Sequence, residues 1–334
     1  GGIHVFATRI YLATSQVPRD YGLATSLGTV AALIGVVGIY YYHRVTRVQQ
    51  RFATITGKGY RPRRIDLGPW RKWAGTAIIA YFLLMVLLPT VILLYASTQP
   101  YFRPPSIAAF EGASLDAYRG LFKQSAFWIG LKNSLLLIAV VPIATVLLSA
   151  MVSWVVVRSS VRGRGILDAL AFVPFTAPSI VFGLAFLLMA LWIDWIPLYG
   201  TIWLIMLVHV SRFLAYGTRT TNGAMFQLHK ELEEAGAVSG VGWFTVFRQI
   251  TLRLLVPSLV AGWLWVAIHS GRELSMALLI STRDSQILSV ISWAAWENGR
   301  SDEAAALGII LMMIMSTIVV TARLLTLRLT KEQG

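Results

Sequence analysis

The sequence contains no cysteine and few charged residues. Cysteine is absent from all 334 positions, and Asp, Glu, Lys and Arg together make up 13% of the chain. The missing thiols exclude a disulfide framework, a thiolate metal site and a cysteine nucleophile. The low charge content accompanies 56% apolar residues, which is outside the usual range of a soluble globular domain. The composition therefore predicts a membrane protein.

The charge that is present has one dominant sign. The chain has 29 Lys and Arg residues against 15 Asp and Glu residues, which gives a formal net charge of +14. A basic excess can serve a nucleic acid or a membrane surface, and the position of the charges decides between them. Here the basic residues lie between long apolar runs. The sequence therefore predicts the lipid bilayer as a partner and no nucleic acid.

The apolar residues gather in stretches of spanning length. A bilayer core of about 30 Å needs about 20 mostly apolar residues in a helix. Seven stretches meet or approach this length, at residues 22–42, 75–97, 134–157, 167–193, 201–218, 255–281 and 304–327. They lack the alternation of polar and apolar residues that β-barrel strands show. The sequence thus predicts an all-α, polytopic membrane protein.

The basic residues also predict an orientation, because cytoplasmic loops of membrane proteins are enriched in Lys and Arg. Of the 29 basic residues, 19 lie in segments 43–73, 158–165, 219–254 and 323–331, and 8 lie in the alternate segments. The N-terminus is therefore expected outside and the C-terminus in the cytoplasm. Residues 43–73 are strongly basic and are expected to be a linker, so that one span precedes a unit of six spans.

Segment 219–254 is the longest expected cytoplasmic segment of the six-span unit. It holds the acidic residues Glu231, Glu233 and Glu234, which suit the positive end of a helix dipole. Gly240 is expected to end this helix, and a second helical piece with aromatic residues follows. The pattern predicts two short helices around a glycine, a form that can transmit a rigid-body movement. The alternative is an amphipathic helix on the bilayer, which three glutamates disfavour.

This segment resembles the cytoplasmic signature of ABC importer permeases, in which Glu-Ala-Ala is followed at fixed spacing by Gly and by Ile-x-Leu-Pro. The residues that match the signature or adjoin it are Glu233, Glu234, Ala235, Gly236, Gly240, Ile250 and Leu252. Two positions depart, since Gly236 replaces the second Ala and Arg253 replaces the Pro. The resemblance implies that these residues couple the chain to a cytoplasmic ABC ATPase subunit. It further implies that this chain is not an enzyme and carries no cofactor.

Other stretches are similar to the fused two-half permeases for ferric iron. They are TRIYLA (8–13), DYGLA (20–24), FATITGKGYRPRRIDLG (52–68), LKNSLLL (131–137) and SGRELSMALLI (270–280). The similarity covers essentially the whole chain and implies the type I (MetI-like) permease fold. It implies that residues 1–42 are the end of a preceding half and that residues 43–73 link the two halves. Residues 74–328 are then the six-span domain, and residues 329–334 are a cytoplasmic tail.

The same resemblance implies a multi-pass protein of the cell inner membrane with its N-terminus on the periplasmic side. Its expected partners are the ATPase, a periplasmic substrate-binding protein, and the missing N-terminal half or a second permease copy. Permeases for thiamine, sulfate, molybdate and polyamines share the signature, so these substrates stay open. More distant alternatives are a transporter driven by an ion gradient, which would need carboxylates in the spans, and an intramembrane enzyme, which would need a convergent catalytic set.

Few polar residues fall inside the expected spans. Arg272 and Glu273 are expected either to line the translocation path or to be held in structural ion pairs. Pro174 and Pro178 predict a broken helix that lines the path, with a simple bend as the alternative. The sequence shows no catalytic set and no His, Asp or Glu spacing typical of a metal site.

Two further polar positions are expected to be structural. His209 is expected to bond a nearby backbone carbonyl rather than a ligand. Asn133 and Ser134, at the entrance of the span 134–157, are expected to cap the helix that begins there.

Overall fold

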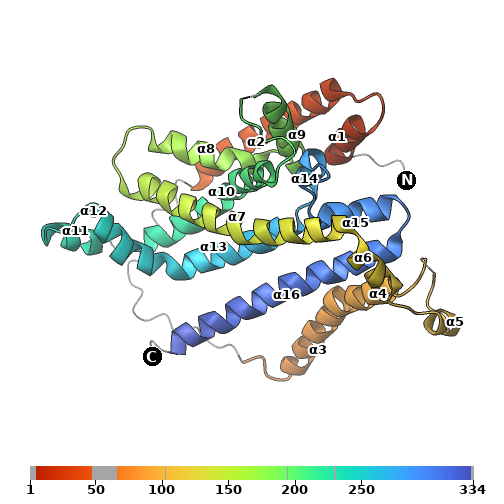
Figure 1. The fold of residues 1–334 in the computed structure, drawn as a ribbon. Coiled ribbons are helices and arrows are strands. Elements are labelled where there is room, and N and C mark those ends of the chain that lie inside the picture. The colour runs from red at the N-terminus through yellow and green to blue at the C-terminus, as the bar shows by residue number, and fades with distance from the viewer. Residues whose placement is uncertain (1–4, 47–65, 102, 194, 229–230, 332–334) are drawn as a thin grey trace.

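The computed structural model is a bundle of helices (Figure 1). It describes residues 5–46, 66–101, 103–193, 195–228 and 231–331. All regular structure in these ranges is helical, which confirms the predicted all-α class. Five helices in the described ranges are long and apolar enough to cross a membrane, or six if one bent pair counts as a single span.

The N-terminal part of the chain contributes α1 (Phe6–Ser15) and α2 (Tyr21–Thr46). The predicted linker 43–73 lies largely outside the described residues. After it come α3 (Trp70–Phe82), the π-helical turn η2 (Leu83–Leu87), α4 (Leu88–Ser97), α5 (Ile107–Glu111), α6 (Asp116–Lys123) and α7 (Ser125–Arg158). The remaining helices are α8 (Arg164–Thr176), α9 (Ser179–Trp192), α10 (Ile202–Gln227), α11 (Glu231–Val238), α12 (Trp243–Val246), η3 (Phe247–Thr251), α13 (Leu252–Arg272), α14 (Ser275–Ile280), α15 (Leu288–Glu297) and α16 (Ser301–Lys331).

The core of the bundle lies where α10 and α13 pack against α7. Its buried side chains include Leu137 and Val141 of α7, Leu204 and Val208 of α10, and Val266 of α13. Small residues let these helices approach closely, as is common between membrane helices. At Gly217 of α10, for example, an added Cβ would collide with Ser149 Oγ of α7.

Three of the seven predicted spans differ from the structure. The stretch 167–193 is divided between α8 and α9, which are bent by 108° and count as a span only if they are taken together. The stretch 201–218 lies in α10, which continues to Gln227 through polar residues and is not among the helices apolar enough to span. The stretch 255–281 was predicted as one helix, and this is wrong because the backbone of Glu273 is extended, with φ −66° and ψ 124°. The helix α13 therefore ends at Arg272, and α14 starts at Ser275.

The predicted cap at Asn133 and Ser134 is also wrong in its target. The helix α7 begins at Ser125, so both residues lie within it rather than at its start. Ser134 Oγ instead accepts a bond of 2.9 Å from the backbone N–H of Leu288, the first residue of α15. Asn133 Nδ2 donates to the carbonyl oxygens of Asp284 and Gln286, at 3.0 and 2.9 Å. These side chains therefore fasten the entrance of α15 to α7.

Candidate functional site

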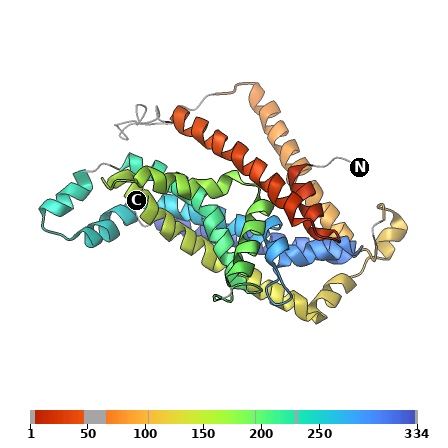
Figure 2. The same ribbon diagram turned by 90° about the horizontal axis from the view of Figure 1, so that it is seen from above.

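The signature loop, residues 231–252, projects from one end of the bundle. Figure 1 shows α11 and α12 at that end, and α1, α6 and α15 at the opposite end. Figure 2 shows the same two short helices, in teal, extending beyond their neighbours. Gly240 separates them in a left-handed conformation, with φ +74°, where residues other than glycine are strained. The predicted form of two short helices around a glycine is thus present.

The first short helix packs closely on the segment that follows the glycine. A Cβ added to Gly236 of α11 would lie 2.8 Å from Val246 Cγ2 and 3.5 Å from Ile250 Cδ1. Val246 is buried, so this side chain has little room to withdraw. The close approach gives a physical reason for glycine at the position where the ABC permease signature has alanine.

The base of the loop is tied to the bundle through Glu233. Glu233 Oε1 lies 3.3 Å from Arg158 Nε and accepts a bond of 2.9 Å from Thr251 Oγ1. Arg158 is the last residue of α7, and its side chain is only 5% exposed. Its Nη2 also donates to the carbonyl oxygens of Met225 and Leu228, at 3.1 and 2.6 Å, where α10 ends. One guanidinium therefore joins α7, α10 and α11.

The outer surface of the loop is accessible. Glu234 and Ala235 are exposed, whereas Ile250 and Leu252 are half-buried at the base. A hollow of about 270 Å³ opens beside the loop, with both Glu233 and Glu234 on its edge. Its other lining residues include Trp154 of α7 and Phe247 of η3, whose rings meet edge to face. The loop thus presents carboxylates next to an apolar hollow.

Sequence reasoning missed Arg158, Thr251 and Trp154 as parts of this site. In the sequence, Arg158 is only one of the cations that indicate a cytoplasmic segment. Its partner Glu233 lies 75 positions further along the chain. No local pattern joins residues that distant, because only the packing of α7 against α10 brings them together.

The first helix break separates α8 from α9, whose axes differ by 108°. Ala177 and Pro178 between them have extended backbones, as the sequence prediction of a broken helix at Pro174 and Pro178 requires. The freed carbonyl groups receive bonds from Arg212 of α10, whose Nη1 donates to the oxygens of Pro174 and Ala177. A side chain on a neighbouring helix thus satisfies backbone groups that the break exposes.

The second helix break, at Glu273 and Leu274, separates α13 from α14. Glu273 Oε1 accepts a hydrogen bond of 3.4 Å from the N–H of Met276. The carbonyl oxygen of Glu273 accepts a hydrogen bond of 2.9 Å from Ser289 Oγ. Glu273 also interacts electrostatically with Arg212 at the first break. Side chains of opposite charge therefore stand at the two breaks, and each bonds backbone groups of its own break.

Arg272 precedes Glu273 in the chain but makes different contacts. It forms no ion pair with Glu273 in the described residues, and its Nη2 donates to His269 Nε2 at 3.2 Å. The His269 ring stacks on Trp265 with centroids 3.7 Å apart, and Trp265 stacks on Tyr216 at 3.6 Å. Arg272 is exposed at the end of this column of rings. The two residues predicted together for the path thus have different surroundings.

His209 has the structural role that the sequence predicted. It is fully buried, and its Nδ1 bonds the carbonyl oxygen of Ile205 at 2.7 Å. Within the described residues, no group of three or more His, Asp or Glu side chains is arranged to hold a metal ion.

We expect Arg212→Met to lower the stability of the protein, because it leaves the carbonyl groups of Pro174 and Ala177 without these donors. An unsatisfied buried polar group costs about 1–3 kcal/mol, so the thermal midpoint of the purified protein should fall clearly. Arg212→Lys keeps a charged donor and should fall less. The control is Arg283→Met, an exposed arginine outside the helices. Equal midpoints for Arg212→Met and this control would contradict the role given to Arg212.

Comparison with known proteins places this arrangement among transport proteins. A family model described as "Binding-protein-dependent transport system inner membrane component" matches residues 145–329. The chain is 24% identical over 329 residues to the ferric transport system permease protein FbpB of Actinobacillus pleuropneumoniae, covering 96% of this chain and 46% of that protein. It is 26% identical over 234 residues to the putrescine transport system permease protein PotI of Escherichia coli K12, covering 68% of this chain and 82% of that one.

A solved structure has a similar fold. It is the crystal structure of a bacterial ABC transporter involved in the import of the acidic polysaccharide alginate, with a TM-score of 0.61 and 18% identity. The match covers 78% of this chain and 97% of the other. The chain spans about half the length of the ferric permease relatives that it matches, 46% and 45% for the two with the longest matches.

Proposed function

Because the chain belongs to the family of binding-protein-dependent transport system inner membrane components, we propose that it is the C-terminal half of the permease of an ATP-driven ABC importer. ATP is hydrolysed on a separate cytoplasmic subunit. The observation that carries this proposal is the signature loop, which projects from one end of the bundle with Glu234 exposed and Glu233 anchored.

The anchoring of the loop supports a route for movement into the bundle. A force on α11 reaches α7 through the pair of Glu233 and Arg158, and it reaches the end of α10 through the bonds of Arg158 to Met225 and Leu228. It reaches α13 directly, because η3 runs into α13 without a gap. These are the three helices at the core of the bundle.

The same helices lead to the two breaks. The helix α10 carries Arg212, which bonds the first break, and α13 ends at Arg272, next to Glu273 in the second break. Movement of the loop can therefore shift the breaks relative to each other. We place the translocation path along Pro174, Pro178, Arg272 and Glu273, because discontinuous helices commonly form the substrate sites of transporters.

The proposed substrate is ferric iron, delivered by a periplasmic binding protein. The support is the resemblance of the linker and of the stretch 270–280 to ferric permeases, together with the relatives named for ferric transport. A polyamine or sulfate substrate is the second candidate, favoured by the similarity to permeases named for putrescine and sulfate transport.

The proposed orientation puts the signature loop and the C-terminus in the cytoplasm and the N-terminus on the periplasmic side of the inner membrane. Residues 1–42 then end the preceding half, 43–73 link the halves, and 74–328 form this half. The end of the bundle that carries α6 and α15 then faces the binding protein. The support is the distribution of basic residues, which favours the end with the signature loop.

We expect Glu234→Arg to reduce co-purification of the complete permease with its ATPase by at least tenfold. The reason is that a cation replaces an exposed carboxylate at the docking surface. Repulsion between like charges, or loss of an opposite-charge pair, across an interface costs about 1.4 kcal/mol or more, which lowers the affinity about tenfold. The control is Glu297→Arg, the same change at an exposed residue of α15 at the opposite end. Retention of the ATPase by Glu234→Arg would remove the main support for the importer assignment.

A further inference from the structure

The chain contains the same helical element twice. In each copy a short helix is followed by a turn and a long helix, as α1 and α2 in one copy and α15 and α16 in the other. The long helices share the pattern Ala-x-x-Leu-Gly, which is Ala24 to Gly28 in α2 and Ala304 to Gly308 in α16. The pattern begins at the fourth residue of both helices, since α2 starts at Tyr21 and α16 at Ser301. Such a repetition is expected if the chain contains equivalent elements of two related halves, as in the proposed two-half permease.

The first copy shows what this element packs against. The glycine of its pattern, Gly28, faces α9, because an added Cβ would lie 2.7 Å from Val181 Cγ1. One heptad later, Gly35 approaches the end of α8, where an added Cβ would lie 2.9 Å from the carbonyl oxygen of Thr176. Ala24, which opens the pattern, is fully buried. The helix α2 thus lies against the first helix break through its small residues.

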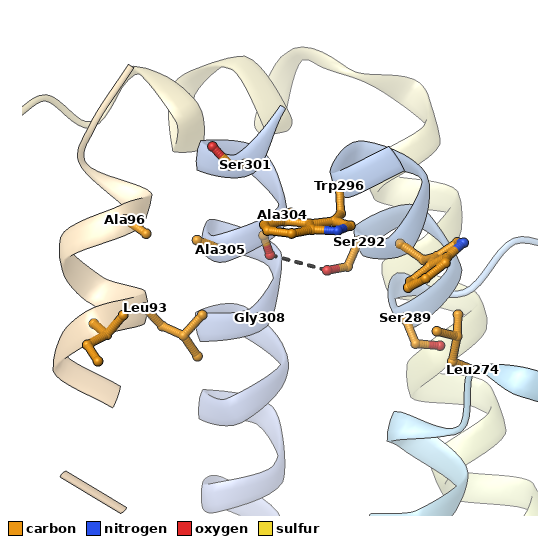
Figure 3. Close-up of a pocket in the computed structure, with 12 residues that line it drawn as sticks. Leu93, Ala96, Leu274, Ser289, Ser292, Trp296, Ser301, Ala304, Ala305 and Gly308 are labelled. Atoms are coloured by element: carbon orange, nitrogen blue, oxygen red, sulfur yellow. Dashed lines mark hydrogen bonds between the residues drawn. The ribbon is translucent and has the colours of Figure 1, made fainter. Parts of the chain in front are cut away.

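In the second copy, Ala304 and Ala305 are buried, but the glycine of the pattern, Gly308, has no close partner in the described part of the chain. A Cβ added to Gly308 meets nothing within 4 Å. Instead, a hollow of about 500 Å³ opens over Ala304, Ala305 and Gly308. Figure 3 shows α16 as the floor of this hollow, with Ala96 of α4 on one side and Trp296 of α15 on the other. The lining is mainly apolar.

A contact between the two copies indicates how the halves are related. Tyr11 of α1 and Trp293 of α15 meet edge to face with ring centroids 6.1 Å apart, and Trp293 Nε1 lies 3.5 Å from Tyr11 Oη. Equivalent elements touch each other in this way close to a two-fold axis. Around such an axis every contact has a counterpart with the roles of the two halves exchanged. The contact between α2 and α9 therefore requires a counterpart. In that counterpart, α16 presents its small residues to the helix of the other half that corresponds to α9.

We propose that the hollow over Ala304, Ala305 and Gly308 is the socket for the helix of the preceding permease half that corresponds to α9. An aliphatic side chain at the position of Val181 in that half fills the space beside Gly308. The proposal rests on the proposed two-half permease. The repeated Ala-x-x-Leu-Gly pattern favours a helix of the other half over a lipid acyl chain, since the equivalent residues of α2 already hold such a helix.

The test is disulfide crosslinking in the full-length, two-half permease, from which any cysteines of the other half have been removed. Gly308→Cys is combined with cysteine at the residue of the first half that aligns with Val181. The linker is then cut by a protease site inserted into residues 47–65, and joined halves are detected on a non-reducing gel. The positive control is Gly28→Cys with Val181→Cys. These two residues lie on opposite sides of the linker in the sequence and in contact in the structure. The negative control is Met313→Cys, an exposed residue on another part of α16.

We expect the Gly308 pair to crosslink with a yield within about twofold of the positive control and the Met313 pair to remain uncrosslinked. The proposal is overturned if the positive control crosslinks and the Gly308 pair does not, or if Met313 reacts as well as Gly308. It is also overturned if the positive control fails, because the contact of α2 with α9 is its premise. Quenching of a fluorophore on Gly308→Cys by brominated acyl chains, without crosslinking, identifies lipid as the occupant.

The crosslinking result is independent of transport. A permease that crosslinks at Gly308 but imports nothing in the presence of ATP and its ATPase keeps the socket and loses the proposed importer function. A permease that imports its substrate with ATP but does not crosslink at Gly308 keeps the proposed importer function and loses the socket.

Discussion

Gly183→Val is expected to prevent stable folding of the permease. Gly183 of α9 faces the backbone of α14, where an added Cβ would lie 2.9 Å from the carbonyl oxygen of Met276 and 3.0 Å from its Cα. Backbone atoms cannot rotate away as a flexible side chain can, and Met276 itself is fully buried. The two helices must therefore separate, and overpacking of this kind costs about 3 kcal/mol. The separation also disturbs the contact between the two helix breaks.

The measurement is the amount of monodisperse, fluorescently tagged permease on size exclusion, followed by the thermal midpoint of the fraction that survives. Gly75→Val is the matched control, because a Cβ added to Gly75 of α3 meets nothing within 4 Å. Gly183→Ala should lie between the wild type and Gly183→Val, since its single methyl still meets the backbone of Met276. Similar yields from Gly183→Val and Gly75→Val would show that α9 and α14 do not need this close approach.

Arg158→Met is expected to disconnect the signature loop from the bundle. The substitution leaves Glu233 without its ion pair and leaves the carbonyl groups of Met225 and Leu228 without a donor. Loss of one partner of a buried ion pair costs about 3–5 kcal/mol. We expect the lower end, because the Glu233 side chain is 21% exposed. ATP-driven uptake by the reconstituted complex should fall at least tenfold, whereas the ATPase should still bind through the exposed face of α11.

Uptake and ATPase co-purification, measured on the same preparations, separate this outcome from a simple loss of docking. The control is Arg162→Met, which removes an exposed arginine at the same end of the bundle. A double-mutant cycle with Glu233→Gln isolates the pair, because removal of both charges should recover part of the stability that Arg158→Met loses. Full uptake by Arg158→Met would contradict the proposed route of movement through α7 and α10.

The two breaks differ in how far sequence reasoning could reach. Pro174 and Pro178 predicted the first break because proline removes backbone donors and clashes with the preceding turn of a helix. The second break has no proline or glycine at Glu273 and Leu274, so the stretch 255–281 looked continuous. There the helix ends because Glu273 and Ser289 offer alternative bonds to the backbone. Those bonds depend on α15 lying beside the break, which no local pattern indicates.

The all-α class, most of the spanning stretches and the spacing of the signature loop follow from the residues alone. The length of an apolar stretch, the distribution of charge and the turn residues act within a few helical turns. Each of them can therefore be recognised within one segment of the sequence. Three contacts depend on the packing of the helices: Arg158 holds Glu233, Arg212 bonds the first break, and Ser134 bonds α15 rather than its own helix. These bonds join residues far apart in the chain, and the close packing of small residues between helices decides which of them can meet.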